Sequence, residues 1–539
     1  MISRREFLAS LPVAGVTASA QALSLRATPE NGHERPNVLI FMPDQQQGAT
    51  VLPGHPCLTP NIDRFAQQGL LFPNAFCPAP HCCPSRASLM TGMYPSEHGI
   101  FNNVDTDTAI HTDPSPGMRY FSQSLKDAGF NLGYSGKWHV GRTLRPEHVG
   151  WENLNAPAPR LSHIGEDHRP AHWRQAEAEL GAAGRREIGE VIRPGWGNTR
   201  LFGLSKALFE ELHDYRIVQD GIRGIRAFAA KREPWCVMIS NDGGHDLYDP
   251  PEQFLKLYDW KQIELPKSFR DRMHDKPRIY LRMRLQYWDQ LSDDEVKMCI
   301  AHYYALLTMQ DHLFGQMLQA LDEIGQAENT LVIYCSDHGD YAGAHGLWAK
   351  GVPSFREGYN IPCILRWPRR IGNPGRRPDA LVSTVDIAPT ILEAAGAHAL
   401  PASGRSLVPW FDADRVSDWR NAVFMQLNGT ELYYTQRIVM TKRHKYVYNG
   451  FDFDEMYDLV DDPLEMKNLV FHSEPRHGET DRSSGAWPDL SPSLDSVRRD
   501  LLSRMWQFAR DHNDSIFNDY LTVAMAPYGP GIANGRSRI

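Results

Sequence analysis

Five short apolar runs, separated by segments with helical periodicity, constrain the fold of this chain more than any other feature. They occupy residues 38–42, 130–135, 235–240, 330–336 and 361–367. Continuous apolar runs of this length are typical of strands that are buried on both faces. Their alternation with helices predicts an α/β fold, in which a large, mostly parallel sheet is sandwiched by helices. The predicted helices include residues 60–68, 121–128, 204–231, 293–324 and 387–395.

The pattern changes after about residue 415. Residues 422–427 and 433–448 are rich in β-branched and aromatic side chains, which favours antiparallel strands, and residues 497–511 follow as a helix. We expect a smaller C-terminal α+β domain here. The predicted organisation is a signal segment and linker at 1–30, a catalytic domain at 31–415 and the smaller domain at 416–539.

Length and charge narrow the functional classes. A chain of 539 residues exceeds what one hydrophobic core usually serves, and its formal net charge of −8 argues against a nucleic-acid partner. Eight cysteines are too few for a disulfide scaffold; whether Cys57 and Cys77 pair stays open. Beyond the N-terminus, no apolar stretch is long enough for stable membrane insertion.

The N-terminus has the features of an export signal. Ser3-Arg4-Arg5-Glu6-Phe7-Leu8 is a twin-arginine pattern, an apolar stretch follows, and Ala18-Ser19-Ala20 offers a cleavage site. The alternative is a basic N-terminal tail without a targeting role. We expect an exported, periplasmic protein.

The sharpest chemical signal is Cys82-Cys83-Pro84-Ser85-Arg86. Pro84 suits the first position of a helix, so Cys82 is expected just before a helix N-terminus, where backbone N–H groups favour an anion. Such a place, with Arg86 nearby, suits an activated nucleophile. The alternative is a buried structural cysteine.

Other polar residues follow the predicted strands closely. Asp44 and Gln45 come after the first strand, Lys137 and His139 after the second, His245 after the third, and Asp337 and His338 after the fourth. Ligands in parallel sheets bind beyond the carboxyl ends of the strands. Carboxylate and amide oxygens suit a hard divalent cation.

These motifs resemble the type I sulfatases of the alkaline phosphatase superfamily, whose signature is Cys-x-Pro-Ser-Arg with a downstream Thr-Gly. Cys82, Pro84, Ser85, Arg86 and Thr91-Gly92 match it. The resemblance implies that a formylglycine-generating enzyme converts Cys82 to formylglycine. It also implies one divalent metal held by Asp44, Gln45, Cys82, Asp337 and His338. Calcium is the family's usual ion; the imidazole of His338 keeps manganese and zinc as alternatives.

The resemblance also implies catalytic roles. Lys137 would hold the formylglycine hydrate and His139, and His139 would act as the base that releases sulfate. His245 would protonate the leaving group, helped by Lys350, while Arg86 adds positive charge. Asp340, His345, Arg356 and Glu357 belong to the block around Lys350 by resemblance and are expected either to support the site or face the substrate, or to have structural roles.

Two departures from the family pattern keep alternatives open. Gln45 replaces a usual acidic residue, and with His338 it points to a phosphonate monoester hydrolase or phosphodiesterase of the same superfamily. A non-catalytic glycan-binding homologue is the alternative of another class, although such a protein is expected to lose a catalytic residue.

We expect a sulfated carbohydrate as the substrate, because tryptophans at 151, 173, 196, 260 and 288 suit stacking on sugars. Choline sulfate and aryl sulfates remain alternatives.

The export signal predicts the behaviour of a fusion protein. A reporter that follows residues 1–30 is expected to reach the periplasm, and replacing Arg4 and Arg5 by lysine is expected to retain it in the cytoplasm. Cell fractionation measures both. A reporter that stays in the cytoplasm behind the unaltered segment would contradict the signal.

Overall fold

The structure is a computed structural model that describes residues 35–155, 186–193, 197–429, 432–471 and 490–516. The predicted signal segment at 1–30 lies outside the described residues. Among the helices of the described ranges, none combines the length and the apolar composition that crossing a bilayer requires.

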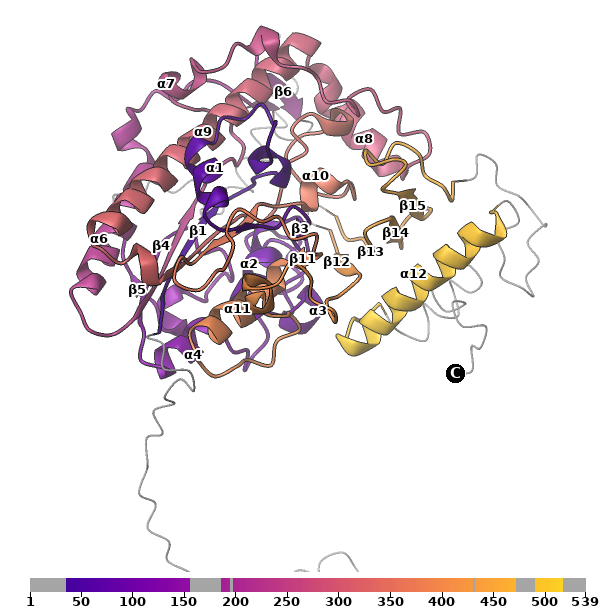
Figure 1. The fold of residues 1–539 in the computed structure, drawn as a ribbon. Coiled ribbons are helices and arrows are strands. Elements are labelled where there is room, and N and C mark those ends of the chain that lie inside the picture. Colours follow the sequence, from indigo (N-terminus) through magenta and orange to yellow (C-terminus); the bar gives the residue numbers. More distant parts are fainter. Residues whose placement is uncertain (1–34, 156–185, 194–196, 430–431, 472–489, 517–539) are drawn as a thin grey trace, which may run out of the picture. The chain divides into compact units, whose positions relative to one another are not determined.

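A seven-stranded sheet forms the centre of the molecule (Figure 1). Its strands lie in the order β2-β10-β9-β1-β8-β4-β5, and the four long central strands, β9, β1, β8 and β4, are parallel. Only β10 runs antiparallel to its neighbours β9 and β2. The predicted mostly parallel sheet is therefore confirmed. The strands are β1 (Asn37–Pro43), β2 (Leu70–Leu71), β4 (Asn131–Gly136), β5 (Glu152–Asn153), β8 (Trp235–Asn241), β9 (Thr330–Cys335) and β10 (Cys363–Arg366).

Helices cover both faces of this sheet, as the apolar runs predict (Figure 1). In β1, Leu39 and Phe41 point into one core, whereas Val38, Ile40 and Met42 point into the other. The first core includes α1 (Pro60–Gln67), α6 (His213–Ala229) and α9 (Asp293–Glu323). The second includes α2 (Cys82–Thr91), α4 (Phe121–Asp127) and α11 (Ile387–Ala394).

One predicted helix is shorter than expected. Residues 204–231 were expected to be largely helical, but α6 begins at His213. Leu204 and Leu208 have helical spacing, yet they are 42% and 67% exposed. Without a core to bury that apolar pair, a helix there has no packing to stabilise it.

The C-terminal part contains the expected antiparallel sheet, of order β12-β13-β14-β15, with α12 packed on β13 and β14. The expected strand at 433–448 is a hairpin of two strands, because the chain turns at 441–443. The domain boundary at 415 stays a prediction. The elements are β12 (Val423–Leu427), β13 (Gln436–Met440), β14 (His444–Asn449), β15 (Glu455–Asp458) and α12 (Pro492–Asp511).

The remaining described elements are short. Two small sheets pair β3 (Ala75–Phe76) with β11 (Val382–Ser383), and β6 (Glu190–Arg193) with β7 (Gly197–Arg200). The short helices are α3 (Pro95–His98), α7 (Glu252–Leu255), α8 (Arg278–Gln286) and α10 (Arg356–Tyr359).

A buried ion pair ties the chain after α12 to the C-terminal sheet. Arg437 on β13 binds both carboxylate oxygens of Asp514, at 2.6 and 2.8 Å, and Gln426 donates to the same carboxylate. The two charged side chains are 3% and 1% exposed, so each depends on the other for its charge compensation.

Asp514→Ala is expected to lower the free energy of unfolding by about 3–5 kcal/mol, because it leaves a buried guanidinium unpaired. Burial opposes ionisation of Asp514, but Arg437 outweighs it and lowers the pKa of the carboxyl. The stabilisation is therefore present above the unfolded-state pKa of about 4 and is lost as the pH falls through the lower folded-state pKa.

Urea denaturation at several pH values measures this effect. Asp500→Ala is the matched control, since it breaks the more exposed pair with Arg504 and is expected to cost less than about 1 kcal/mol. Equal costs for the two variants would contradict the prediction.

Candidate functional site

The carboxyl ends of the parallel strands bring the predicted site residues together. Asp44 directly follows β1, and Lys137 directly follows β4. Asp337 lies two residues after the end of β9, and His245 lies four residues after the end of β8. Gly136 lets β4 end against β8: it has a φ of +99°, and a Cβ there would lie 2.0 Å from the carbonyl oxygen of Ser240. The backbone N–H of Lys137 donates to that same carbonyl at 2.8 Å.

The nucleophile candidate lies on α2, with one correction to its predicted place. Cys82 is the first residue of the helix, not the residue before it, and Pro84 is the third. A proline is tolerated anywhere in the first turn, because the N–H groups there have no partner within the helix. The hydroxyl of Ser85 donates to the carbonyl oxygen of Asp337 at 2.5 Å, which fixes the helix tip to the loop after β9.

Arg86 binds residues that follow three strands of the sheet. Its Nε donates to Asp337 Oδ2 at 2.7 Å, and its terminal nitrogens donate to Asp44 Oδ2 at 3.0 Å and to the carbonyl oxygen of Lys137 at 2.8 Å. All of these side chains except Lys137 are fully buried. The ion pairs therefore set the positions of both carboxylates.

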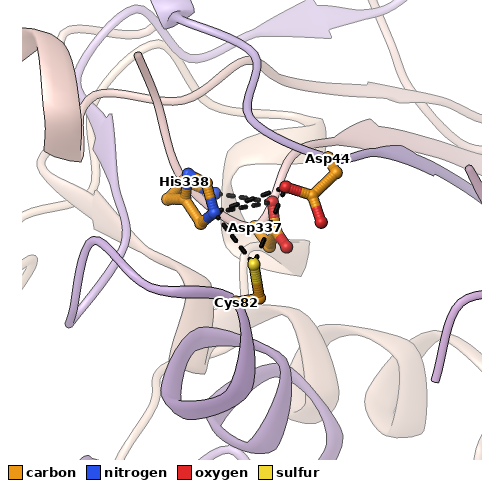
Figure 2. A group of neighbouring side chains, drawn as sticks. All are labelled: Asp44, Cys82, Asp337 and His338. Atoms are coloured by element: carbon orange, nitrogen blue, oxygen red, sulfur yellow. Dashed lines mark hydrogen bonds and ion pairs between the residues drawn. The ribbon is translucent and has the colours of Figure 1, made fainter. Parts of the chain in front are cut away.

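Figure 2 shows the group that results: Asp44, Cys82, Asp337 and His338 point toward one another. One potential ligand atom from each lies within 4.8 Å of the others. His338 Nε2 is 3.3 Å from the sulfur of Cys82 and 3.4 Å from Asp44 Oδ1. Two carboxylates and one imidazole are a donor set that suits a divalent cation.

Lys137 completes this group from the β4 side. Its Nζ lies 2.8 Å from Asp44 Oδ2 and 4.0 Å from the sulfur of Cys82. Burial disfavours the charged forms of both side chains. The positive charge of Lys137 nevertheless lowers the pKa of Asp44, and the negative charge of Asp44 raises the pKa of Lys137. The carboxylate is thus ionised and the lysine charged at neutral pH.

The side chain of Gln45 has partners outside the four-residue group. Its amide nitrogen donates to Asp340 at 2.6 Å and to Asp246 at 3.3 Å, and its amide oxygen accepts from Lys350 at 2.8 Å. Its backbone N–H donates to Asp337 at 3.1 Å. Its role as a metal ligand stays a prediction that requires the amide oxygen to exchange Lys350 for a cation.

Lys350 and His245 form a proton-sharing pair beside the group. Lys350 Nζ lies 2.7 Å from His245 Nε2, and His245 Nδ1 lies 2.6 Å from the carbonyl oxygen of Asp246. Nδ1 of His245 faces a carbonyl oxygen and must donate its proton there, which leaves Nε2 of a neutral His245 as the acceptor for Lys350. Burial opposes the charge of Lys350, but nearby anions, first the Cys82 thiolate and Asp44, outweigh it and raise its pKa.

His139 lies beside the helix tip, where its side chain interacts with Cys82 and Cys83. Its Nε2 is 3.2 Å from Asp105, and its side chain is 12% exposed. Burial opposes its protonation, but Cys83 and Asp105 outweigh it and raise the pKa of His139 well above its ordinary value. Asp105 was not predicted, because its loop follows no strand and carries no motif.

Several predictions around the site need correction or refinement. His345 stacks on Phe355 at 3.5 Å and bonds Asp271, so it supports a loop. Arg356 bonds Asn74. Trp151 and Trp288 are buried in the two cores, at 3% and 5% exposure, and are packing residues. Trp173 and Trp196 lie outside the described residues.

All eight cysteines are unpaired thiols, Cys57 and Cys77 among them. Cys82 differs from the others in its electrostatics. Burial opposes its ionisation, but Lys137, Lys350 and His338 outweigh it, so the pKa of this thiol lies well below its usual value. For Cys236, in the core, burial raises the pKa.

A protein that retains Cys82 unmodified is expected to hold it as a thiolate below the usual thiol pKa of about 8.5. Ultraviolet absorbance of the thiolate, followed against pH, measures this. Lys137→Met is expected to raise the apparent pKa, and Cys236→Ala to leave the titration unchanged. A thiolate that forms only near the usual pKa would contradict the described electrostatics.

Comparisons with known proteins agree with this geometry. The family model described as "Sulfatase" matches residues 36–397, and the model "N-sulphoglucosamine sulphohydrolase, C-terminal" matches residues 343–480. The uncharacterized sulfatase YidJ of Escherichia coli (strain K12) is 28% identical and is aligned over 81% of this chain and 83% of its own length. The choline-sulfatase of Rhizobium meliloti is 26% identical, with 88% and 90% covered. The N-acetylglucosamine-6-O-sulfatase of Bacteroides thetaiotaomicron is 24% identical, with 85% and 86% covered.

The solved structures extend the likeness in fold. The phosphonate monoester hydrolase of Agrobacterium radiobacter has a TM-score of 0.68 at 21% identity, with 89% of this chain and 96% of that chain covered. The family model spans most of the sheet and every predicted catalytic residue. The chain therefore belongs to the sulfatase family and is an enzyme that hydrolyses sulfate esters.

Proposed function

We propose that this sulfatase cleaves sulfate monoesters of a carbohydrate through a formylglycine made from Cys82, with a divalent cation beside it. The contact of Cys82 with Asp44 and His338, at the first turn of α2, is the observation that carries the proposal. An anion that approaches this point meets the N-terminus of a helix and the charges of Lys137 and Lys350.

The cation would be held by Asp44, Asp337 and His338, with Gln45 and the residue at 82 as further ligands. The Oδ2 atoms of both aspartates are taken up by Arg86, whereas the Oδ1 atom of Asp44 faces His338 and Cys82. Calcium suits the carboxylates; manganese and zinc suit the imidazole better. When bound, such an ion neutralises charge that develops on the sulfate oxygens.

Each basic group has a distinct proposed task. A formylglycine hydrate at position 82 supplies one hydroxyl for attack on sulfur and a second for the release of sulfate. Lys137, which lies 4.0 Å from this position, holds the attacking oxygen. The pair His245 and Lys350 donates a proton to the departing oxygen, and the contact between them supports transfer from either group.

In its unprotonated form, which its raised pKa makes the minor form at neutral pH, His139 is proposed to take the proton of the second hydroxyl. Its position beside Asp105 supports this role, because the carboxylate orients the imidazole and stabilises the imidazolium that forms. Arg86 acts indirectly. It fixes the positions of the two carboxylates and is buried together with them.

A carbohydrate substrate is supported by relatives rather than by the tryptophans. The Bacteroides thetaiotaomicron relative is described as an N-acetylglucosamine-6-O-sulfatase, while the Rhizobium meliloti relative is described as a choline-sulfatase. We retain choline sulfate as the second candidate substrate. A glycan-binding role without catalysis is disfavoured, because all six proposed catalytic residues are present.

Maturation and export are proposed together. Residues 1–30 support export through a twin-arginine pathway, which carries folded proteins, to the periplasm. The formylglycine-generating enzyme must act on an unfolded motif, since Cys82 is buried in the folded chain. Conversion before export satisfies both conditions.

The purified enzyme is expected to hydrolyse an aryl sulfate faster than an aryl phosphonate ester, and mass spectrometry is expected to find an aldehyde at position 82. Cys82→Ala should abolish turnover, and His139→Ala should lower kcat by about 10²- to 10⁴-fold. His398→Ala, at an exposed position, is the control and should change nothing. A faster reaction with the phosphonate ester would favour the phosphonate hydrolase alternative.

The cation is expected to stabilise the fold. At about 100 times its Kd, calcium should raise the free energy of unfolding by about 2.7 kcal/mol over metal-free protein. Asp337→Asn should remove this gain, while Asp311→Asn, a buried carboxylate that binds α1, should retain it. Thermal denaturation with calcium, manganese or zinc measures the gain; stabilisation by zinc alone would overturn the choice of calcium.

A further inference from the structure

A second group of potential metal ligands lies beside the proposed catalytic centre and shares no residue with the group in Figure 2. The sulfur of Cys83, a carboxylate oxygen of Asp105 and a ring nitrogen of His139 lie within 4.8 Å of one another. Two of them already touch, since His139 Nε2 is 3.2 Å from Asp105 Oδ1.

The first turn of α2 carries one cysteine of each group, and the side chain of His139 interacts with both cysteines. Successive helical residues point about 100° away from each other, so Cys82 and Cys83 face different sides of the helix tip. Cys83 is fully buried and accepts from the backbone N–H of Val104, in the loop that also carries Asp105. The side chain of Asp105 is 44% exposed, which leaves an approach from solvent.

The donor chemistry of the two groups differs. In the mature enzyme the first would offer two carboxylates, one imidazole and the oxygen of a formylglycine, whereas the second combines one thiolate, one imidazole and one carboxylate, a set typical of zinc. Ligand atoms around a tetrahedral zinc lie about 3.5 Å apart, so the three side chains need to close by roughly 1 Å. We propose that Cys83, Asp105 and His139 form a second, inhibitory site for zinc and similar soft divalent cations.

Occupation would stop turnover through His139. Binding of zinc releases to solvent the thiol proton of Cys83 and the proton that His139 carries on the coordinating nitrogen, and the cation then takes the lone pair of that nitrogen. A coordinated nitrogen no longer accepts a proton, so the release of sulfate would stall. This consequence rests on the proposed role of His139; the binding of zinc by the three side chains does not.

The test uses the mature enzyme in excess calcium, so that calcium occupies the proposed catalytic cation site and zinc is left to bind at the second site. Equilibrium dialysis measures bound zinc, cobalt(II) reports a thiolate ligand through its charge-transfer absorption, and aryl sulfate turnover reports inhibition. The wild type is expected to bind one zinc per chain with a thiolate signature and to lose activity.

Cys83→Ser retains an acceptor for the N–H of Val104. It is expected to weaken zinc binding at least tenfold, as loss of a ligand does, and to raise the inhibitory zinc concentration equally. Cys57→Ser, at another buried thiol, is the matched control and should bind zinc as the wild type does. Mass spectrometry of position 82 verifies that each variant is matured.

The outcomes separate this inference from the proposed function. An active enzyme that binds no zinc in excess calcium, or a Cys83→Ser variant that binds it unchanged, would overturn the second site alone. Zinc bound through Cys83 without loss of turnover would retain the site and refute the inhibitory role of His139. A protein that binds zinc through Cys83 but has no sulfatase activity would refute the proposed function instead.

Discussion

A guanidinium enclosed between two carboxylates holds the centre of this enzyme together. Arg86 on α2 binds Asp44 after β1 and Asp337 after β9, and all three side chains are fully buried. Separating these groups would leave a buried charge unpaired, which costs free energy. The tip of α2 and the ends of β1 and β9 are therefore held in one arrangement. Because Arg86 occupies the Oδ2 atoms, Asp44 Oδ1 stays directed at Cys82 and His338.

Neighbouring residues in the chain serve different sides of this centre. Lys137 binds Asp44, whereas His139, two residues later, binds Asp105. Cys82 and Cys83 divide in the same way across the tip of α2. The site thus joins four potential metal ligands, the pair of Lys350 and His245, and His139 with its carboxylate.

Local patterns predicted the elements well where burial and periodicity agree. The run at 38–42 is apolar on both faces because both faces of β1 are covered. The pattern failed at 204–208, where Leu204 and Leu208 have helical spacing but no core to pack on. The pattern also misplaced the start of α2. A proline is compatible with any position of the first turn, so Pro84 does not identify the first residue of the helix.

By itself the sequence determined five strands of a mostly parallel sheet, the family signature at Cys82 and the basic residues that follow the strands. These depend on local composition and spacing, which a linear chain carries in full. The short edge strands β2 and β5 and the antiparallel direction of β10 came from the structure. Only the tertiary structure decided that Gln45 turns to Lys350, that Asp105 meets His139, and that Trp151 is a packing residue. Such contacts join loops far apart in the chain, and their geometry exists only once the strands are aligned.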